Sequence, residues 1–356
     1  MKELQVLDLV LMLTGCKIIR DGRWTAVLNN TMFFLAASIE LLLGLAFAVQ
    51  ADKIPGLLNI YIITLYIPHY AYGIVFEVVM RINRNSQYQF LKQVINKTSS
   101  DRRKRLGKTS LIYSVIIIAW TVPTTASYLH LALKFHEENP QEILEICLFY
   151  LDVYLTMFAR WILISFLVCC YFMKATSYFE LTFMDHLHGI VKGRTVNLAE
   201  VLVNIHKVSL LKKQCMSLLG VIPCLLVVYL FCATSGLILQ LKRLGFDMDT
   251  WTETAIMVGY FICLFYMTYV ADKCTQEATK MADAVTLVVL SSGNEEWHQL
   301  IAPLRSLATM QHHPCRLFTI NYQFIISFLS SFITFTVLLT QILHDVAVSK
   351  HHTHHE

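Results

Sequence analysis

Long apolar runs recur seven times along the chain, separated by shorter polar segments. They cover residues 27–49, 54–80, 111–134, 143–173, 215–241, 252–272 and 316–343. An α-helix rises about 1.5 Å per residue, so about 20 apolar residues cross the roughly 30 Å of bilayer hydrocarbon. Because irregular backbone cannot face lipid, each run is predicted to be a helix, with kinks at Pro68, Pro123 and Pro223. The pattern predicts an all-α, polytopic membrane protein with seven transmembrane helices in one domain, residues 1–356.

Composition agrees with a bilayer as the solvent. Hydrophobic residues make up 56% of the 356 residues, charged residues make up 15%, and the mean hydropathy is +0.53. These values are too apolar for a soluble domain of this size. Most of the ten cysteines fall in apolar runs or in loops predicted to be cytosolic, so we expect buried thiols rather than disulfides. The first 26 residues lack the apolar core of a secretory signal, and the first span is expected to be the signal anchor.

The distribution of basic residues predicts the orientation. Of the 29 Lys and Arg residues, 23 lie in the N-terminal segment and in alternate loops at 81–110, 174–214 and 273–316. Basic loops stay on the cytoplasmic side, so the N-terminus is predicted to be cytoplasmic and the C-terminus extracellular. This order is opposite to that of a G-protein-coupled receptor. The glycosylation sequons at Asn29 and Asn96 are therefore expected to remain unmodified.

The cytoplasmic segments are predicted to continue as long helix extensions. Asn197 and Glu200 fit a helix N-cap, and apolar residues follow at helical spacing over 198–208. Similar stripes occupy 281–289 and, after a Ser-Ser-Gly break, 297–304. Apolar stripes outside the bilayer need partners. These partners lie either within one subunit or in a cytoplasmic platform shared between subunits.

The last apolar run carries a polar stripe on one helix face. Its members are Ser327, Ser331, Thr334, Leu338, Gln341 and Asp345. Unsatisfied polar groups facing lipid cost several kcal/mol, so the stripe should face protein or water. In one interpretation it packs against neighbouring helices, and Gln341 bonds across that contact. In the other it lines a pore, where Leu338 is a dewetting constriction, Gln341 a neutral polar ring and Asp345 an acidic ring at the outer mouth.

A short motif in the same run resembles the C-terminal signature of insect gustatory receptors. That signature is Thr-Tyr, five hydrophobic residues, then Gln-Phe, and this chain has Thr334-Phe335, five residues, then Gln341-Ile342. The preceding residues 312–331 are also similar to the run that leads into that family's last helix. Two departures stand out: Phe335 lacks the phenol hydroxyl, and Ile342 replaces an aromatic residue.

The resemblance implies a tetrameric, ligand-gated, nonselective cation channel in the plasma membrane of chemosensory neurons. It implies that the last helix of each subunit lines the pore, that Gln341 and Ile342 form the gate region, and that the cytoplasmic helix ends form an anchor. The implied partners are a small-molecule tastant, permeating cations, membrane lipids and other gustatory receptor subunits in a homo- or heterotetramer. The alternative function is a seven-helix chemoreceptor that signals through a partner protein without conducting ions.

The outer halves of the spans hold the candidate ligand-binding residues. They are Tyr61, Tyr66, Tyr128, His130, Tyr150, Asp152, Tyr154, Trp251 and Tyr260. Aromatic faces with a few hydrogen-bonding groups suit sugars, alkaloids and other small organic molecules, although aromatic residues also belt the membrane interface without any ligand. Asp152 and Arg160 are charges within a span; Asp152 is the ligand or gating candidate, and Arg160 has Glu40 as one possible partner.

Enzymatic chemistry finds no support in the motifs. The chain has no HExxH, Walker, GxSxG or CxxC pattern, so we expect no enzyme, no cofactor and no metal site. The histidines at 351–355 fit a flexible extracellular tail. The basic run 102–105 fits a topology signal, and no nucleic acid partner is expected beside a membrane.

Overall fold

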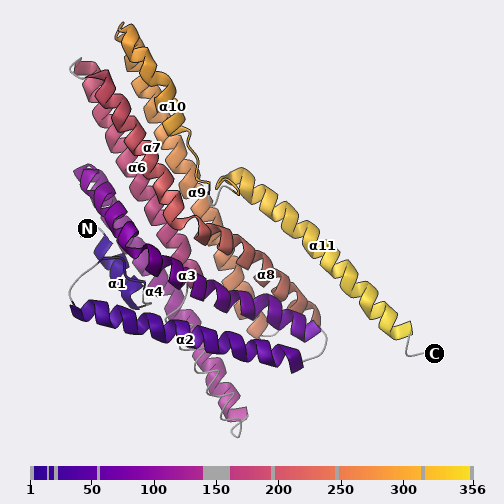
Figure 1. Cartoon of the computed structure of the whole chain (residues 1–356). Helices are drawn as coiled ribbons and strands as arrows, with labels where there is room; N and C mark the ends of the chain where they lie inside the picture. Colours follow the sequence, from indigo (N-terminus) through magenta and orange to yellow (C-terminus); the bar gives the residue numbers. More distant parts are fainter. Residues whose placement is uncertain are drawn as a thin grey trace.

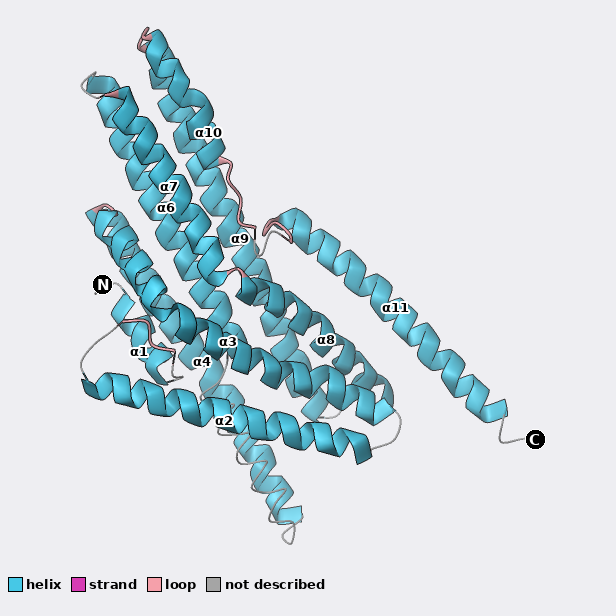
Figure 2. Ribbon diagram, in the orientation of Figure 1, coloured by secondary structure: helices cyan, strands magenta, loops and turns pink. Residues whose placement is uncertain are grey.

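A computed structural model describes residues 4–13, 16–19, 23–53, 57–138, 161–193, 197–244, 248–313 and 317–352. All regular structure in these ranges is helical, which confirms the predicted all-α class. The helices are α1 Gln5–Leu13, α2 Arg23–Lys53, α3 Leu57–Lys97, α4 Ser100–Glu138, α6 Trp161–Gly193, α7 Leu198–Leu219, α8 Val221–Leu244, α9 Met248–Ser291, the 3-10 helix η2 Glu295–Leu300, α10 Ile301–Ala308 and α11 Tyr322–His352. Figure 2 shows long helices joined by short described loops.

Several helices are much longer than a bilayer is thick. α3 has 41 residues and α9 has 44, which correspond to about 60 to 65 Å of helix against roughly 30 Å of hydrocarbon. Both are therefore much longer than a membrane span requires, and Figure 1 shows the course of these two helices through the molecule. Within the described residues, three helical stretches are long and apolar enough to cross a membrane by themselves: Ser100–Pro123, Ile162–Gly193 and Val221–Ile238.

Helix α6 forms the centre of the bundle. Every residue from Ile162 to Met173 is buried, as expected for a helix that is apolar all round. α6 packs along α9 and also contacts α3 and α4, while α3 packs against α2 and α8. By contrast, α2 leaves large apolar side chains such as Trp24, Phe34 and Leu42 exposed. That exposure suits a helix at the lipid-facing edge.

Local signals in the sequence set several helix ends. The side chain of Asn197 accepts a hydrogen bond from the Ala199 N–H at 3.0 Å, so the predicted N-cap of α7 is confirmed. Gly293 has φ +67° and ends the long α9 before η2. The predicted kink at Pro223 takes another form. The helix breaks at Gly220, and Pro223 lies in the first turn of α8, where its missing N–H costs least.

The predicted amphipathic stretch after Gly293 packs within the subunit. Trp297, Leu300 and Leu304 are all buried there. These three apolar residues therefore have their packing partners inside one subunit. The described cysteines are free thiols. Asn29 is also buried, and its side-chain oxygen accepts from the Lys17 N–H at 2.9 Å, which agrees with the expectation of an unmodified sequon.

Candidate functional site

Helix α11 has three faces that differ in chemistry. Successive helical residues are turned by about 100°, so residues three or four apart share a face. One face is aromatic, with Phe324, Phe328, Phe332 and Phe335. The second is the predicted polar stripe, and the third carries Ile326, Ile333 and Val337. Figure 1 shows α11 leaning away from the other helices along most of its length.

Among the described residues, the aromatic face packs within the subunit, together with the buried side chain of Ile325. The ring of Phe335 lies 4.7 Å, between centroids, from that of Phe231 on α8. The rings of Phe328 and Phe332 each lie 6.2 Å from Phe261 on α9. Phe335 therefore contacts α8.

The polar stripe is uncovered in the single subunit. Its described members are all exposed: Ser327, Ser331, Thr334, Leu338 and Gln341. The Thr334 hydroxyl donates to the Ser330 carbonyl at 3.0 Å, which satisfies it within the helix. The α11 backbone continues through Ile342 and Asp345, whose side chains lie outside the described residues. The residues that the structure describes therefore leave these five side chains uncovered.

The first turn of α11 is fastened to α9. The Tyr322 N–H donates to the Asp272 carboxylate at 3.0 Å, and the Phe324 N–H donates to the Asn321 side chain at 2.9 Å. A carboxylate at a helix N-terminus also meets the positive end of the helix dipole. Asp272 could not be predicted from the sequence, because nothing in the spacing relates it to a helix that begins fifty residues later. α11 is thus fixed at one end and lightly packed along the rest.

One predicted ligand-binding residue lies in a cluster of buried tyrosines. Tyr260 on α9 is 6.3 Å, between ring centroids, from Tyr229 on α8, and Tyr229 is 5.9 Å from Tyr72 on α3. The Tyr72 hydroxyl donates to Ser165 on α6 at 2.7 Å. Four helices therefore meet around three phenol rings. Of the three tyrosines, only Tyr260 was predicted from the sequence. Tyr72 and Tyr229 also fall in predicted spans, which is the signal that could have identified them.

Of the other predicted ligand residues, only His130 has a side chain among the described residues. His130 is exposed on α4. Tyr150, Asp152 and Tyr154, together with Arg160, lie outside the described residues. The same holds for the side chains of Tyr61, Tyr66, Tyr128, Trp251 and Glu40. The proposed pairing of Arg160 with Glu40 stays a prediction.

A buried polar node lies in the extensions, where α6, α7 and α10 meet. The Lys212 ammonium is 2.9 Å from a Glu180 carboxylate oxygen and donates to the Leu307 carbonyl at 3.2 Å. The two charged side chains are only 5% and 1% exposed. His312 is buried close by, and burial, with smaller contributions from Lys212 and His313, lowers its pKa to about 3. Its carbonyl accepts from the Ile320 N–H at 2.9 Å, which closes the linker between α10 and α11.

The chain is similar in fold to solved structures of other proteins. No protein-family model matches the sequence, and no curated protein matches it either. Among solved structures, the insect olfactory receptor OR5 from Machilis hrabei superposes with a TM-score of 0.74 at 12% identity, over 95% of this chain and 97% of that one. The same receptor in complex with eugenol gives 0.70 with the same identity and coverage. Both are structures of a receptor rather than of an enzyme. The chain therefore has the fold of an insect olfactory receptor.

Proposed function

We propose that this chain is a subunit of a ligand-gated, nonselective cation channel that responds to small-molecule tastants. Four subunits surround a pore lined by α11, in the plasma membrane of chemosensory neurons. The observation that carries the proposal is the uncovered polar stripe of α11. The fold is that of an insect olfactory receptor, and the Thr334-Phe335 to Gln341-Ile342 motif resembles that of gustatory receptors.

The three faces of α11 fit a pore helix. The aromatic face holds it to its own subunit, and the apolar face with Ile333 and Val337 suits lipid or the neighbouring subunit. The polar stripe then faces the central axis of the pore. An amide such as that of Gln341 costs several kcal/mol against lipid but nothing against water. Leu338 forms the dewetting constriction, and Gln341 with Ile342 forms the gate region.

The extensions supply surfaces for assembly. Although Trp297 and Leu300 are buried within the subunit, Val203 and Leu210 on α7 and Leu287 on α9 remain exposed. These side chains lie beyond the predicted spans, so lipid does not cover them. We assign them to a cytoplasmic platform between subunits, which would hold four copies together while α11 moves.

The tyrosine cluster supports a ligand site between α3, α6, α8 and α9. Aromatic faces with a few hydroxyl groups suit small organic molecules, and the OR5 receptor binds one such molecule, eugenol. Tyr260 forms the floor of the proposed site, and Asp152 with the outer aromatic candidates forms its mouth. A tastant bound there would wedge between helices that contact α11 through Phe231 and Phe261.

Cysteine accessibility tests the pore. Thr334→Cys and Leu338→Cys are exposed to a membrane-impermeant thiol reagent in purified, bilayer-reconstituted protein, with and without agonist, after the native reactive cysteines are replaced. Ile333→Cys is the matched control, because Ile333 is 61% exposed in one subunit but lies on the apolar face. We expect agonist-dependent block of current at Thr334 and Leu338 only. Equal modification at Ile333, or no modification of the stripe in any state, contradicts the proposal.

Recordings from the same bilayers separate conduction from signalling through a partner protein, because only a channel carries current with no other component.

We also predict that Asp345→Asn lowers the single-channel cation current at low ionic strength and leaves it unchanged at high salt. Four carboxylates at the outer mouth concentrate cations by a potential that salt screens. If the wild type and Asp345→Asn carry equal currents across a salt series, Asp345 does not lie at the outer mouth of the pore.

A further inference from the structure

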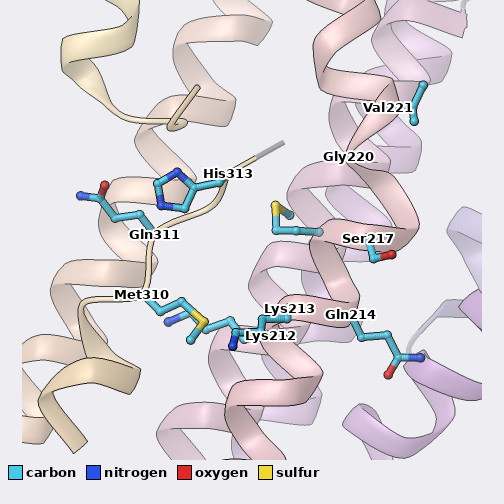
Figure 3. Close-up of a pocket in the computed structure, with 10 residues that line it drawn as sticks. Lys212, Lys213, Gln214, Ser217, Gly220, Val221, Met310, Gln311 and His313 are labelled. Carbon is cyan, nitrogen blue, oxygen red and sulfur yellow. The ribbon is translucent and has the colours of Figure 1, made fainter. Parts of the chain in front are cut away.

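A cavity of about 710 Å³ lies where α7 gives way to α8, facing the linker between α10 and α11. Residues between Lys212 and Val221 form one wall, and Met310, Gln311 and His313 form the other. Figure 3 shows Met310 directed from the linker toward Lys212 and Lys213. The proposed channel function makes no use of this cavity, which is separate from both the stripe and the tyrosine cluster.

The charge of the lining is positive. None of the ten described lining residues is acidic. Lys212 is already neutralised by Glu180. Lys213 is exposed and pairs with no acidic residue among those the structure describes. Among the described residues, the cavity therefore presents an ammonium group without an acidic partner, together with the hydrogen-bonding side chains of Gln214, Ser217 and Gln311.

The lining changes from charged to apolar along one wall. Lys213 lies at one end, and Gly220 and Val221 lie at the other, about 12 Å further along the helix axis. Val221 opens the stretch Val221–Ile238, which is long and apolar enough to cross a bilayer. The charged end thus lies on the side of the extensions and the apolar end on the side of the membrane. A phospholipid has the same order of headgroup and acyl chain.

We propose that this cavity binds a phosphate-bearing anion, with Lys213 contacting the phosphate and Gln214, Ser217 and Gln311 donating hydrogen bonds to it. The headgroup of an anionic phospholipid in the cytoplasmic leaflet has this chemistry, and so does a soluble phosphate. The node behind the cavity keeps its wall in place, because Lys212 joins α7 to α6 and to the end of α10. A bound anion bridges α7 and the linker that leads into α11, so occupancy stabilises one position of that linker.

The test follows thermal unfolding of the purified full-length protein in mild detergent. Dioctanoyl phosphatidic acid is titrated, with dioctanoyl phosphatidylcholine as the neutral control. A ligand that binds the folded state raises the unfolding temperature with concentration. We expect a rise with phosphatidic acid alone. Lys213→Gln weakens the apparent affinity about fivefold, the factor for one lysine near an anionic lipid. Lys207→Gln, an exposed lysine on α7 outside the lining, leaves the affinity unchanged.

Gln311→Leu on the opposite wall is a second variant that also weakens binding. Sodium phosphate then distinguishes the sources: competition at millimolar concentration assigns the site to soluble phosphate, and lack of competition assigns it to the lipid. The proposal is overturned if phosphatidylcholine stabilises as well as phosphatidic acid does. It is also overturned if Lys213→Gln and Gln311→Leu both bind as the wild type does.

Discussion

The node at Lys212 and the stripe on α11 treat polar groups in opposite ways. At the node, a lysine and a glutamate are almost fully buried, and each meets its partner inside the subunit. On α11, hydroxyls and an amide lie along an apolar helix and are exposed within the part of the subunit that the structure describes. The difference separates two uses of polarity. The ion pair at the node stabilises the fold of one chain, whereas the stripe is free to contact water or another chain.

Removing one charge at the node gives the largest expected effect. Lys212→Met leaves the Glu180 carboxylate buried without its ion pair, which costs about 3–5 kcal/mol of unfolding free energy. Chemical denaturation in detergent measures this loss. Lys213→Met, at an exposed neighbour, is the control and changes stability by less than about 0.5 kcal/mol. If both substitutions have the same small effect, the node is not a fixed part of the fold.

Packing inside the bundle is the next test of its rigidity. A Cβ added at Gly259 on α9 would overlap the indole ring of Trp120 on α4, so one of the two must move. We expect Gly259→Ala to destabilise the protein by about 3 kcal/mol, the upper end for overpacking. Gly189→Ala on α6 is the matched control, because nothing lies within 4 Å of its added Cβ. It should stabilise by about 0.5–1 kcal/mol. Thermal unfolding of the two variants decides.

Acid should weaken the node through His312. Its folded-state pKa, about 3, is below the unfolded value of 6.5, so the unfolded chain binds the proton first as pH falls. The contribution to stability is complete above about pH 6.5, and about 2 kcal/mol of it is lost by pH 5. His312→Asn should flatten this part of the pH profile of unfolding. An unchanged profile would show that His312 is accessible to protons in the folded state.

The smallest effect is expected where α11 is fastened. Asp272→Ala removes the acceptor for the Tyr322 N–H and should cost about 1 kcal/mol, felt only in the first turn of α11. Amide hydrogen exchange of residues 322–325 measures it, and Asp272→Asn, which keeps an acceptor oxygen, is the control. Faster exchange throughout α6 and α9 would mean that α11 is part of the same cooperative unit as the node.

Local signals allowed much of the fold to be predicted. Asn197 caps α7 and Gly293 ends α9 through their own side chain and backbone. The beginning of the last helix shows the limit of such signals. Apolar residues around Phe318 extend the hydrophobic run, so the span was predicted from residue 316. The helix instead begins at Tyr322, because the Asn321 side chain caps it.

Contacts between distant helices could not be predicted in the same way. The Lys212 and Glu180 pair joins α7 to α6, and Tyr72 meets Ser165 across 93 residues. A helix repeats every 3.6 residues, so its sequence shows which residues share a face but not which helix that face meets. The polar stripe of α11 could be predicted because its residues share one helix face. The contact of Asp272 with α11 and the tyrosine cluster could not be predicted, because they depend on which helices meet.

The exposed amide of Gln341 has a consequence for the life of a newly made subunit. In the proposed channel, a subunit inserted alone would expose this amide to lipid. That free-energy cost would fall only when other subunits arrive and water fills the space between them. In the channel proposed above, the number of complete pores would therefore depend on how fast subunits meet within the membrane.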